Sequence, residues 1–154
     1  MPTRWLTDEE QRAWRAYLES NKVLFDALDR RLQRTADMPH AYYEILVRLS
    51  EAPGRALRMS ELADITRSSR SRLSHATARL EERGWVARTP HETDRRGQIA
   101  TLTDAGFEVL VAAAPDHVET VRRFVIDGLS AAQLAQLTEI GEAIIARVAA
   151  GLPD

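Results

Sequence analysis

Residues 69–80 read SRSRLSHATARL, and this stretch decides the fold. Leu73, Ala76 and Leu80 stand at positions i, i+3 and i+7, so in a helix they share one face, which we expect to be buried. The serines, arginines and histidine between them point away from that face or flank it. The major groove of DNA is wide enough to admit such a helix. The sequence therefore predicts a recognition helix from about Ser69 to Arg83.

The residues on either side complete a helix-turn-helix. Met59–Ile65 predicts a short helix capped by Ser60, and Thr66–Ser69 predicts the turn that follows it. Gly84 stands just beyond the recognition helix, at the position where a left-handed backbone ends a helix at least cost.

A β-hairpin is predicted directly after this helix pair. Trp85–Thr89 and Gln98–Leu102 have the composition of short strands, and the polar loop His91–Gly97 joins them. This arrangement predicts a two-stranded wing beside the recognition helix. The loop carries Arg95 and Arg96, which suit the minor groove because its negative potential attracts arginine.

Two helices are expected before this core. Thr7 and Glu10 form a capping-box pattern at the start of a long helix that runs to about Arg34. A second helix is expected over Pro39–Ser50, followed by strong turn chemistry.

Two more helices are expected after the wing. One begins at Thr103 and runs to about Asp127, with a kink or break near Ala114 because Pro115 lies inside it. Ser130 caps a last helix that runs to about Ala150. The predicted fold is mainly α: a winged helix-turn-helix with a two-stranded β wing, flanked by N- and C-terminal helices.

Charge and composition narrow the function classes. The net charge is −2, but residues 67–96 hold eight arginines against four acids, so this segment carries +4 and the rest −6. A local basic segment is typical of a nucleic-acid interface. The chain has no cysteine, which excludes thiol redox sensing and thiolate metal sites. We expect a cytoplasmic protein, because no apolar run is long enough for a membrane span and no secretory signal is apparent at the N-terminus.

Three motifs together resemble the MarR family of bacterial regulators. Their order and spacing are jointly specific, whereas each motif alone is weak. They are Leu73-Ser74-His75-x-x-x-Arg79-Leu80-Glu81-x-x-Gly84-Trp85-Val86-x-Arg88, then Asp94-Arg95-Arg96, then Leu102-Thr103-x-x-Gly106.

The resemblance implies a single domain over residues 1–154, in which residues 1–35 and 106–154 form dimerisation helices and 36–105 form the DNA-binding region. It further implies a homodimeric repressor that binds a pseudo-palindromic operator on double-stranded DNA and is released by a small aromatic effector. In the family pattern the arginine matching Arg96 enters the minor groove, and the acid matching Asp94 orients it. Two positions depart from the family pattern: Gly97 loosens the turn of the wing, and the small Ala100 stands where the family has a larger β-branched residue.

The candidate DNA-binding residues divide by role. We expect Arg70, Arg72 and His75 at base edges and Ser68, Ser69, Ser71 and Arg79 nearer phosphates, with Arg95 and Arg96 at the wing tip. Arg88 either supports the wing through an ion pair or contacts a phosphate. Glu81 and Glu82 should face away from the duplex, because they would repel it.

Other readings compete with this one. Trp14, Tyr17, His40 and Tyr43 either line an effector pocket or belong to the core or dimer interface. The four histidines show no metal-ligand spacing, and no phosphate loop or nucleophile elbow is present, so we expect no metal, no cofactor and no enzyme activity. The alternative to a sequence-specific regulator is a winged-helix interaction module that binds protein, or binds DNA non-specifically.

Overall fold

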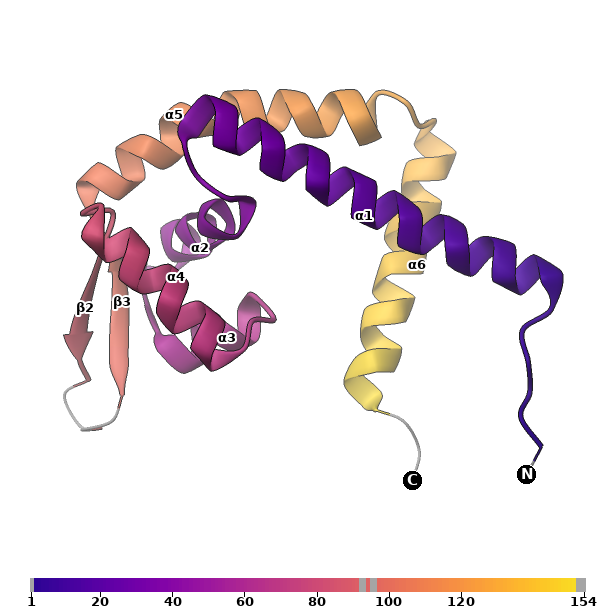
Figure 1. Ribbon diagram of the computed structural model, residues 1–154, viewed down its shortest axis with the longest axis horizontal. Helices are drawn as coiled ribbons and strands as arrows, with labels where there is room; N and C mark the ends of the chain where they lie inside the picture. Colours follow the sequence, from indigo (N-terminus) through magenta and orange to yellow (C-terminus); the bar gives the residue numbers. More distant parts are fainter. Residues whose placement is uncertain (1, 92–93, 95–96, 152–154) are drawn as a thin grey trace. The chain divides into compact units, whose positions relative to one another are not determined.

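The computed structural model describes residues 2–91, 94 and 97–151. It divides into two compact units, Met1–His117 and Val118–Asp154, which are described separately. The first holds the helix-turn-helix and the sheet (Figure 1). As predicted, the fold is mainly α with a small antiparallel sheet. No described helix combines the length and the apolar character that crossing a membrane requires.

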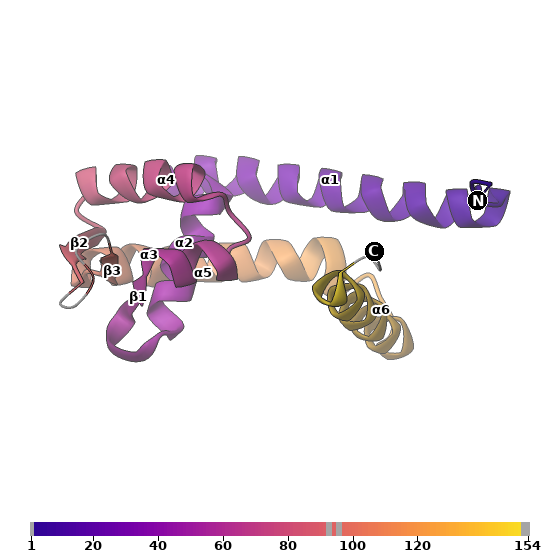
Figure 2. The ribbon, with the colours of Figure 1, turned by 90° about the horizontal axis from the view of Figure 1, so that it is seen from below.

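The first helix, α1 (Asp8–Ala36), begins with the predicted capping box. The Thr7 N–H donates to Glu10 Oε2 at 2.8 Å, and the Glu10 N–H donates to Thr7 Oγ1 at 3.3 Å. Only the C-terminal part of α1 contributes buried side chains, Leu28 and Leu32. Its N-terminal part extends away from α2, α3 and α4 (Figure 2).

The helix-turn-helix packs on the second helix. The second helix is α2 (His40–Glu51), and it is followed by the strand β1 (Ala56–Arg58). The helix-turn-helix consists of α3 (Met59–Ile65) and α4 (Arg70–Glu82). Leucines from three of these helices are almost completely buried and form the centre of the core: Leu46, Leu49, Leu62, Leu73 and Leu80. In the turn, the Ser68 N–H donates to the Ala63 carbonyl at 3.0 Å.

The start of α3 differs from the prediction. Arg58, not Ser60, is the N-cap residue, and Ser60 lies inside the first turn. The Glu61 carboxylate accepts the Arg58 N–H at 3.0 Å, so a side chain from within the helix satisfies the backbone ahead of it. The Ser60 hydroxyl is therefore not used as a cap.

The sheet has one strand more than the sequence predicts. β2 (Val86–Pro90) and β3 (Gln98–Leu102) form the expected hairpin, and β1 pairs with the other edge of β3, giving the order β1-β3-β2. Leu57 on β1 lies opposite Ala100, which is completely buried. The small side chain at position 100 thus lies inside the core.

A compact joint links the end of α4 to the end of the wing. Gly84 has φ +74°, and the Trp85 N–H donates to the Leu80 carbonyl at 3.0 Å, which closes the helix as predicted. Thr103 Oγ1 donates to the Gly84 carbonyl at 2.7 Å and accepts the Gly106 N–H at 3.0 Å. A Cβ at Gly106 would lie 2.1 Å from the Trp85 carbonyl oxygen, so only glycine fits there.

The helix α5 (Asp104–Val121) continues through Pro115, so of the kink or break expected near Ala114 the break is wrong. Leu110 and Ala113, in the turn before the proline, are buried in the core, and this packing offsets the hydrogen bond that proline removes. The irregularity comes later, as a π-helical turn over Arg122–Ile126.

The last helix, α6 (Ala131–Ala150), lies in the second unit. Ser130 caps it as predicted: its Oγ accepts the Gln133 N–H at 3.3 Å, and the Gln133 side chain accepts the Ser130 N–H at 2.9 Å. No residue of α6 is buried, although it carries an apolar stripe that includes Leu137, Ile140 and Ile144.

Candidate nucleic-acid interface

The two faces of α4 separate packing from contact. Leu73, Thr77 and Leu80 are buried, while Ala76 is half-buried. Thr77 is the residue that the apolar pattern missed. Its hydroxyl is buried without a hydrogen-bond partner among the described residues, so here a polar residue occupies the helix's inner face.

The opposite face of α4 is open to solvent. Ser69, Arg70, Ser71, Arg72 and His75 are all exposed. Ser69 is the N-cap, and its Oγ accepts the Arg72 N–H at 3.2 Å. That bond uses an acceptor position of the hydroxyl and leaves its proton available for a phosphate oxygen.

Ser68 belongs to the turn rather than to the helix face. It is half-buried, and its hydroxyl is directed at the Thr66 carbonyl, 3.5 Å away. Of the predicted phosphate contacts in this stretch, Ser68 therefore has the least open surface.

Arginines on and around α4 fall into two groups. Within the described chain, no hydrogen bond or ion pair engages the guanidinium of Arg70 or Arg72. Arg79, by contrast, donates to Glu82 at 2.8 Å, and this bond raises the pKa of Arg79. In any phosphate contact the charge of Arg79 is partly neutralised by Glu82, whereas the full charge of Arg70 and Arg72 is available to the DNA.

Arg88 forms the ion pair that the sequence left as one of two alternatives. Its Nη2 and Nε lie 2.6 Å and 3.0 Å from Glu81 Oε2, and its N–H donates to Glu81 Oε1 at 3.3 Å. These bonds lower the pKa of Glu81. They join strand β2 to the recognition helix, so the pair sets the position of the wing relative to α4.

Part of the predicted wing site can be placed. The Gly97 N–H donates to the Asp94 carbonyl at 2.9 Å, and the His91 N–H donates to the Gly97 carbonyl at 2.9 Å. Asp94 is exposed. Arg95 and Arg96 lie outside the described residues.

The four candidate ligand residues form two separate groups. Trp14 and Tyr17 stack on the exposed part of α1, with ring centroids 6.1 Å apart. His40 and Tyr43 lie instead around His117 of α5, at centroid distances of 5.8 Å and 4.4 Å.

His117 was missed by the sequence analysis, because a lone histidine after a proline carries no distinctive pattern. Burial lowers the pKa of His117 and of His40, and the charge of His40 lowers the pKa of His117 further. His117 Nδ1 is buried without a hydrogen-bond partner among the described residues. Both rings are therefore stabilised in their neutral forms.

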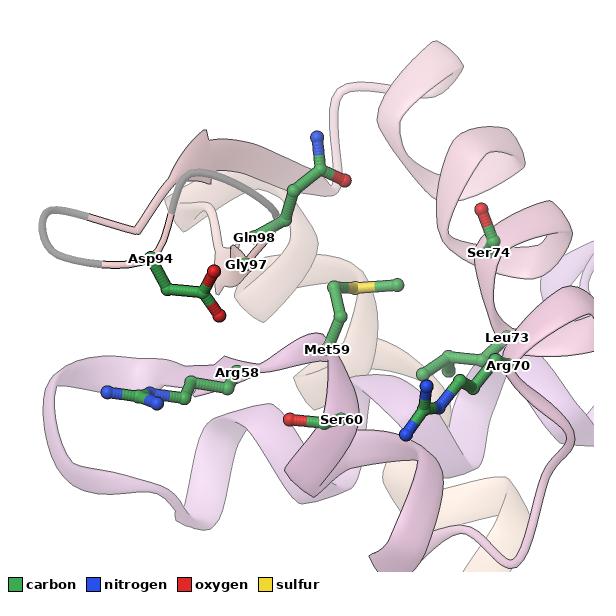
Figure 3. Close-up of a pocket in the computed structure, with 9 residues that line it drawn as sticks. All are labelled: Arg58, Met59, Ser60, Arg70, Leu73, Ser74, Asp94, Gly97 and Gln98. Atoms are coloured by element: carbon green, nitrogen blue, oxygen red, sulfur yellow. The ribbon is translucent and has the colours of Figure 1, made fainter.

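A polar cleft of about 460 Å³ opens between the helix-turn-helix and the wing (Figure 3). Its lining comes from three separate parts of the chain: the β1–α3 junction, the first turns of α4, and the wing loop together with the start of β3. The lining residues are Arg58, Met59, Ser60, Arg70, Leu73, Ser74, Asp94, Gly97 and Gln98. Of these, only Arg70 and Asp94 were expected from the sequence to have functional roles.

An exposed cationic helix beside an antiparallel wing defines the class of winged helix-turn-helix transcription regulators. The chain belongs to the MarR family. The model of that family matches residues 36–97. Sco3205 from Streptomyces coelicolor, a MarR family transcriptional regulator solved in complex with DNA, is 53% identical, with 94% of this chain and 90% of that chain covered and a TM-score of 0.90. Family membership points to transcription regulation and not to an enzyme.

Two curated regulators are also similar to the chain. The HTH-type transcriptional regulator PecS of Dickeya dadantii is 36% identical over 67 residues, which are 44% of this chain and 40% of PecS. The transcriptional repressor MprA of Escherichia coli is 28% identical over 103 residues, which are 67% of this chain and 58% of MprA. The chain therefore spans less than two thirds of either relative.

Proposed function

We propose that this transcription regulator is a cytoplasmic homodimeric repressor that binds a pseudo-palindromic operator in double-stranded DNA. The observation that carries the proposal is the outer face of α4, where the guanidinium groups of Arg70 and Arg72 are exposed and have no acid partner within the described chain. In the major groove, arginine donates two hydrogen bonds to a guanine edge. The DNA complex of Sco3205, at 53% identity, and the repressor MprA support the same reading.

The dimer is inferred from apolar surface that the single chain leaves open. On α6, Ile140 is 55% exposed, Ile145 61% and Val148 74%. On α1, Trp14 is 51% exposed and Tyr17 43%. Apolar surface of this extent marks an interaction site, and a second copy of the chain is the partner proposed. Residues 1–35 and 106–154 are then the dimerisation helices and 36–105 the DNA-binding region.

Two subunits would place their recognition helices in successive major grooves, about 34 Å apart. The test is selection of bound sites from random DNA, followed by footprinting at a salt concentration that suppresses non-specific binding. The expected result is a protected palindrome, together with the mass of two chains in size-exclusion chromatography with light scattering. Arg72→Ala should change the selected sequence.

Protection without a palindrome, or an unchanged preference in Arg72→Ala, would instead favour the interaction module that binds DNA non-specifically. Affinity selection that returned no DNA at all would refute the regulator.

A small aromatic effector is the remaining part of the proposal. The ring group where α2 meets α5, with buried Tyr43 and half-buried His40 and His117, supplies stacking surfaces for it. A panel of aromatic carboxylates should include a compound that raises the melting temperature and lowers DNA affinity. If no member of a broad panel changes either quantity, the effector is abandoned while operator binding stands.

A further inference from the structure

The cleft between α4 and the wing has walls that favour an anion. Its polar side chains include two arginines, two serines and one glutamine, all of which can donate hydrogen bonds. Within the described residues, the side chains of Arg58, Ser60 and Gln98 make no hydrogen bond or ion pair. The nearby acid, Glu61, accepts the backbone N–H of Arg58 and leaves its guanidinium free.

The side chains lie on the two sides of this cleft (Figure 3). Arg70 stands on the α4 side with its guanidinium directed toward Ser60. Arg58 stands at the β1–α3 junction with its guanidinium directed away from Arg70, and Asp94 stands on the wing loop. Among the described lining residues, Asp94 is the one carboxylate, and it already makes an interaction within the protein. An anion is repelled from Asp94 and drawn toward Ser60, between the two arginines.

The position of the cleft identifies the anion. Adjacent major and minor grooves of B-DNA are separated by a single sugar–phosphate backbone. When a protein places a helix in the major groove and a wing in the minor groove, the protein surface between the helix and the wing must therefore face that backbone. Here that surface is the cleft.

We propose that this cleft seats a backbone phosphate of the bound DNA, held by Arg58 and Arg70 with the Ser60 hydroxyl between them. The inference rests on the proposed DNA binding. It adds Arg58 and Ser60, which lie outside the recognition helix and the wing tip, to the interface. It also assigns Arg70 to the DNA backbone instead of the base edge expected for it, and leaves base reading to Arg72. A small aromatic ligand fits the lining poorly, because such sites are mostly apolar and, of the lining residues that the structure describes, only Met59 and Leu73 supply large apolar side chains.

In this role Arg58 positions the protein on the DNA and does not read the base sequence. A phosphate contact is the same for every sequence, so its loss weakens binding to all duplexes alike and reduces the salt dependence of binding. The contact with one phosphate accounts for a slope of about one in log affinity against log salt, which is about two for a dimer.

The experiment compares the full-length wild type with Arg58→Gln by fluorescence anisotropy, on the selected operator and on a scrambled duplex, over a series of salt concentrations. Arg30→Gln is the matched control, because Arg30 is an exposed arginine of α1. Expected for Arg58→Gln are an equal fold-loss on both duplexes, a salt slope smaller by about two, and an unchanged melting temperature. Ser60→Asp, which adds a negative charge to the cleft, should lose more.

Three results would overturn the proposal. One is an Arg58→Gln variant that behaves like Arg30→Gln on both duplexes. Another is a loss confined to the operator, which would make Arg58 a base-reading residue. The third is evidence that the cleft binds free anions and not DNA: inorganic phosphate would stabilise the wild type but not Arg58→Gln, while both proteins bound DNA with the same affinity. A wild type that binds neither duplex would instead refute the proposed function itself, and the inference would fall with it.

Discussion

Thr103→Val tests the joint that connects the recognition helix to the end of the wing. The Thr103 hydroxyl donates to the Gly84 carbonyl at 2.7 Å and accepts the Gly106 N–H at 3.0 Å. Valine has nearly the same shape but can make neither bond. The second bond is an N-cap of α5, whose loss costs about 1 kcal/mol. The first is an ordinary hydrogen bond, worth about 1 kcal/mol net.

The expected loss in the free energy of unfolding is therefore about 2 kcal/mol, somewhat more if the buried Gly106 N–H finds no water. For a chain of this length, about 2–4 °C in melting temperature corresponds to 1 kcal/mol, so the midpoint should fall by about 4–8 °C. Urea and thermal unfolding at one fixed protein concentration measure both quantities, since a dimer's stability depends on concentration.

Thr101→Val is the control for the loss of a hydroxyl from a strand. Thr101 lies on β3, is half-buried, and its hydroxyl makes no hydrogen bond within the described residues. The reasoning fails if Thr103→Val and Thr101→Val have the same stability within about 0.5 kcal/mol, the usual range of neutral surface changes.

Three further changes test other parts of the fold. Gly106→Ala places a Cβ 2.1 Å from the Trp85 carbonyl oxygen, so urea unfolding should show a loss of about 1–3 kcal/mol. Burial lowers the pKa of His40 and His117 in the folded state, so the unfolded chain binds more protons below their ordinary pKa of 6.5. Stability should fall as pH drops from 7 to 5, and less steeply in His117→Phe; equal slopes would contradict this. Glu81→Gln should lower the melting temperature at pH 7, with the difference shrinking as pH falls below 4.5, because the Arg88 bond lowers the pKa of Glu81. A difference independent of pH would show that the ion pair does not cause it.

Much of the recognition helix could be predicted because its signals are local. The leucines on one face and Gly84 beyond the end lie within one short segment, and both were found where expected. The helix, predicted from about Ser69 to Arg83, spans Arg70–Glu82 with Ser69 as its N-cap. The strand Gln98–Leu102 was also predicted with its observed bounds. The motif ending at Gly106 was seen only as a resemblance, and the structure gives its physical cause in the close approach of the Trp85 carbonyl.

The β1–α3 junction could not be predicted for a related reason. A strand of three residues shows no periodicity, and its pairing partner lies far along the chain, with Leu57 opposite Ala100. Ser60 matched the local preference for a cap, but the Glu61 carboxylate and the strand leading into Arg58 set the helix start earlier. At this junction tertiary pairing overrides local propensity. For this reason Arg58 and Ser60 were not predicted as site residues.

The structure also changes what the local basic charge means. Of the arginines in residues 67–96, Arg79, Arg83 and Arg88 are paired with Glu82, Asp37 and Glu81. Their positive charge is largely used within the protein.

Among the described residues, Arg67, Arg70 and Arg72 of the basic segment form no ion pair, and neither does Arg58, which lies outside that segment. The electrostatic footprint therefore combines arginines of the basic segment with Arg58, which the pairing of β1 with β3 brings beside them. If Arg58, Arg70 and Arg72 contact phosphates in both subunits, these three arginines account for a salt slope of about −5, at about −0.9 per phosphate. Each of these arginines that contacts a base instead of a phosphate lowers the magnitude of the salt slope by about two per dimer. The measured slope therefore shows how many of them contact the backbone.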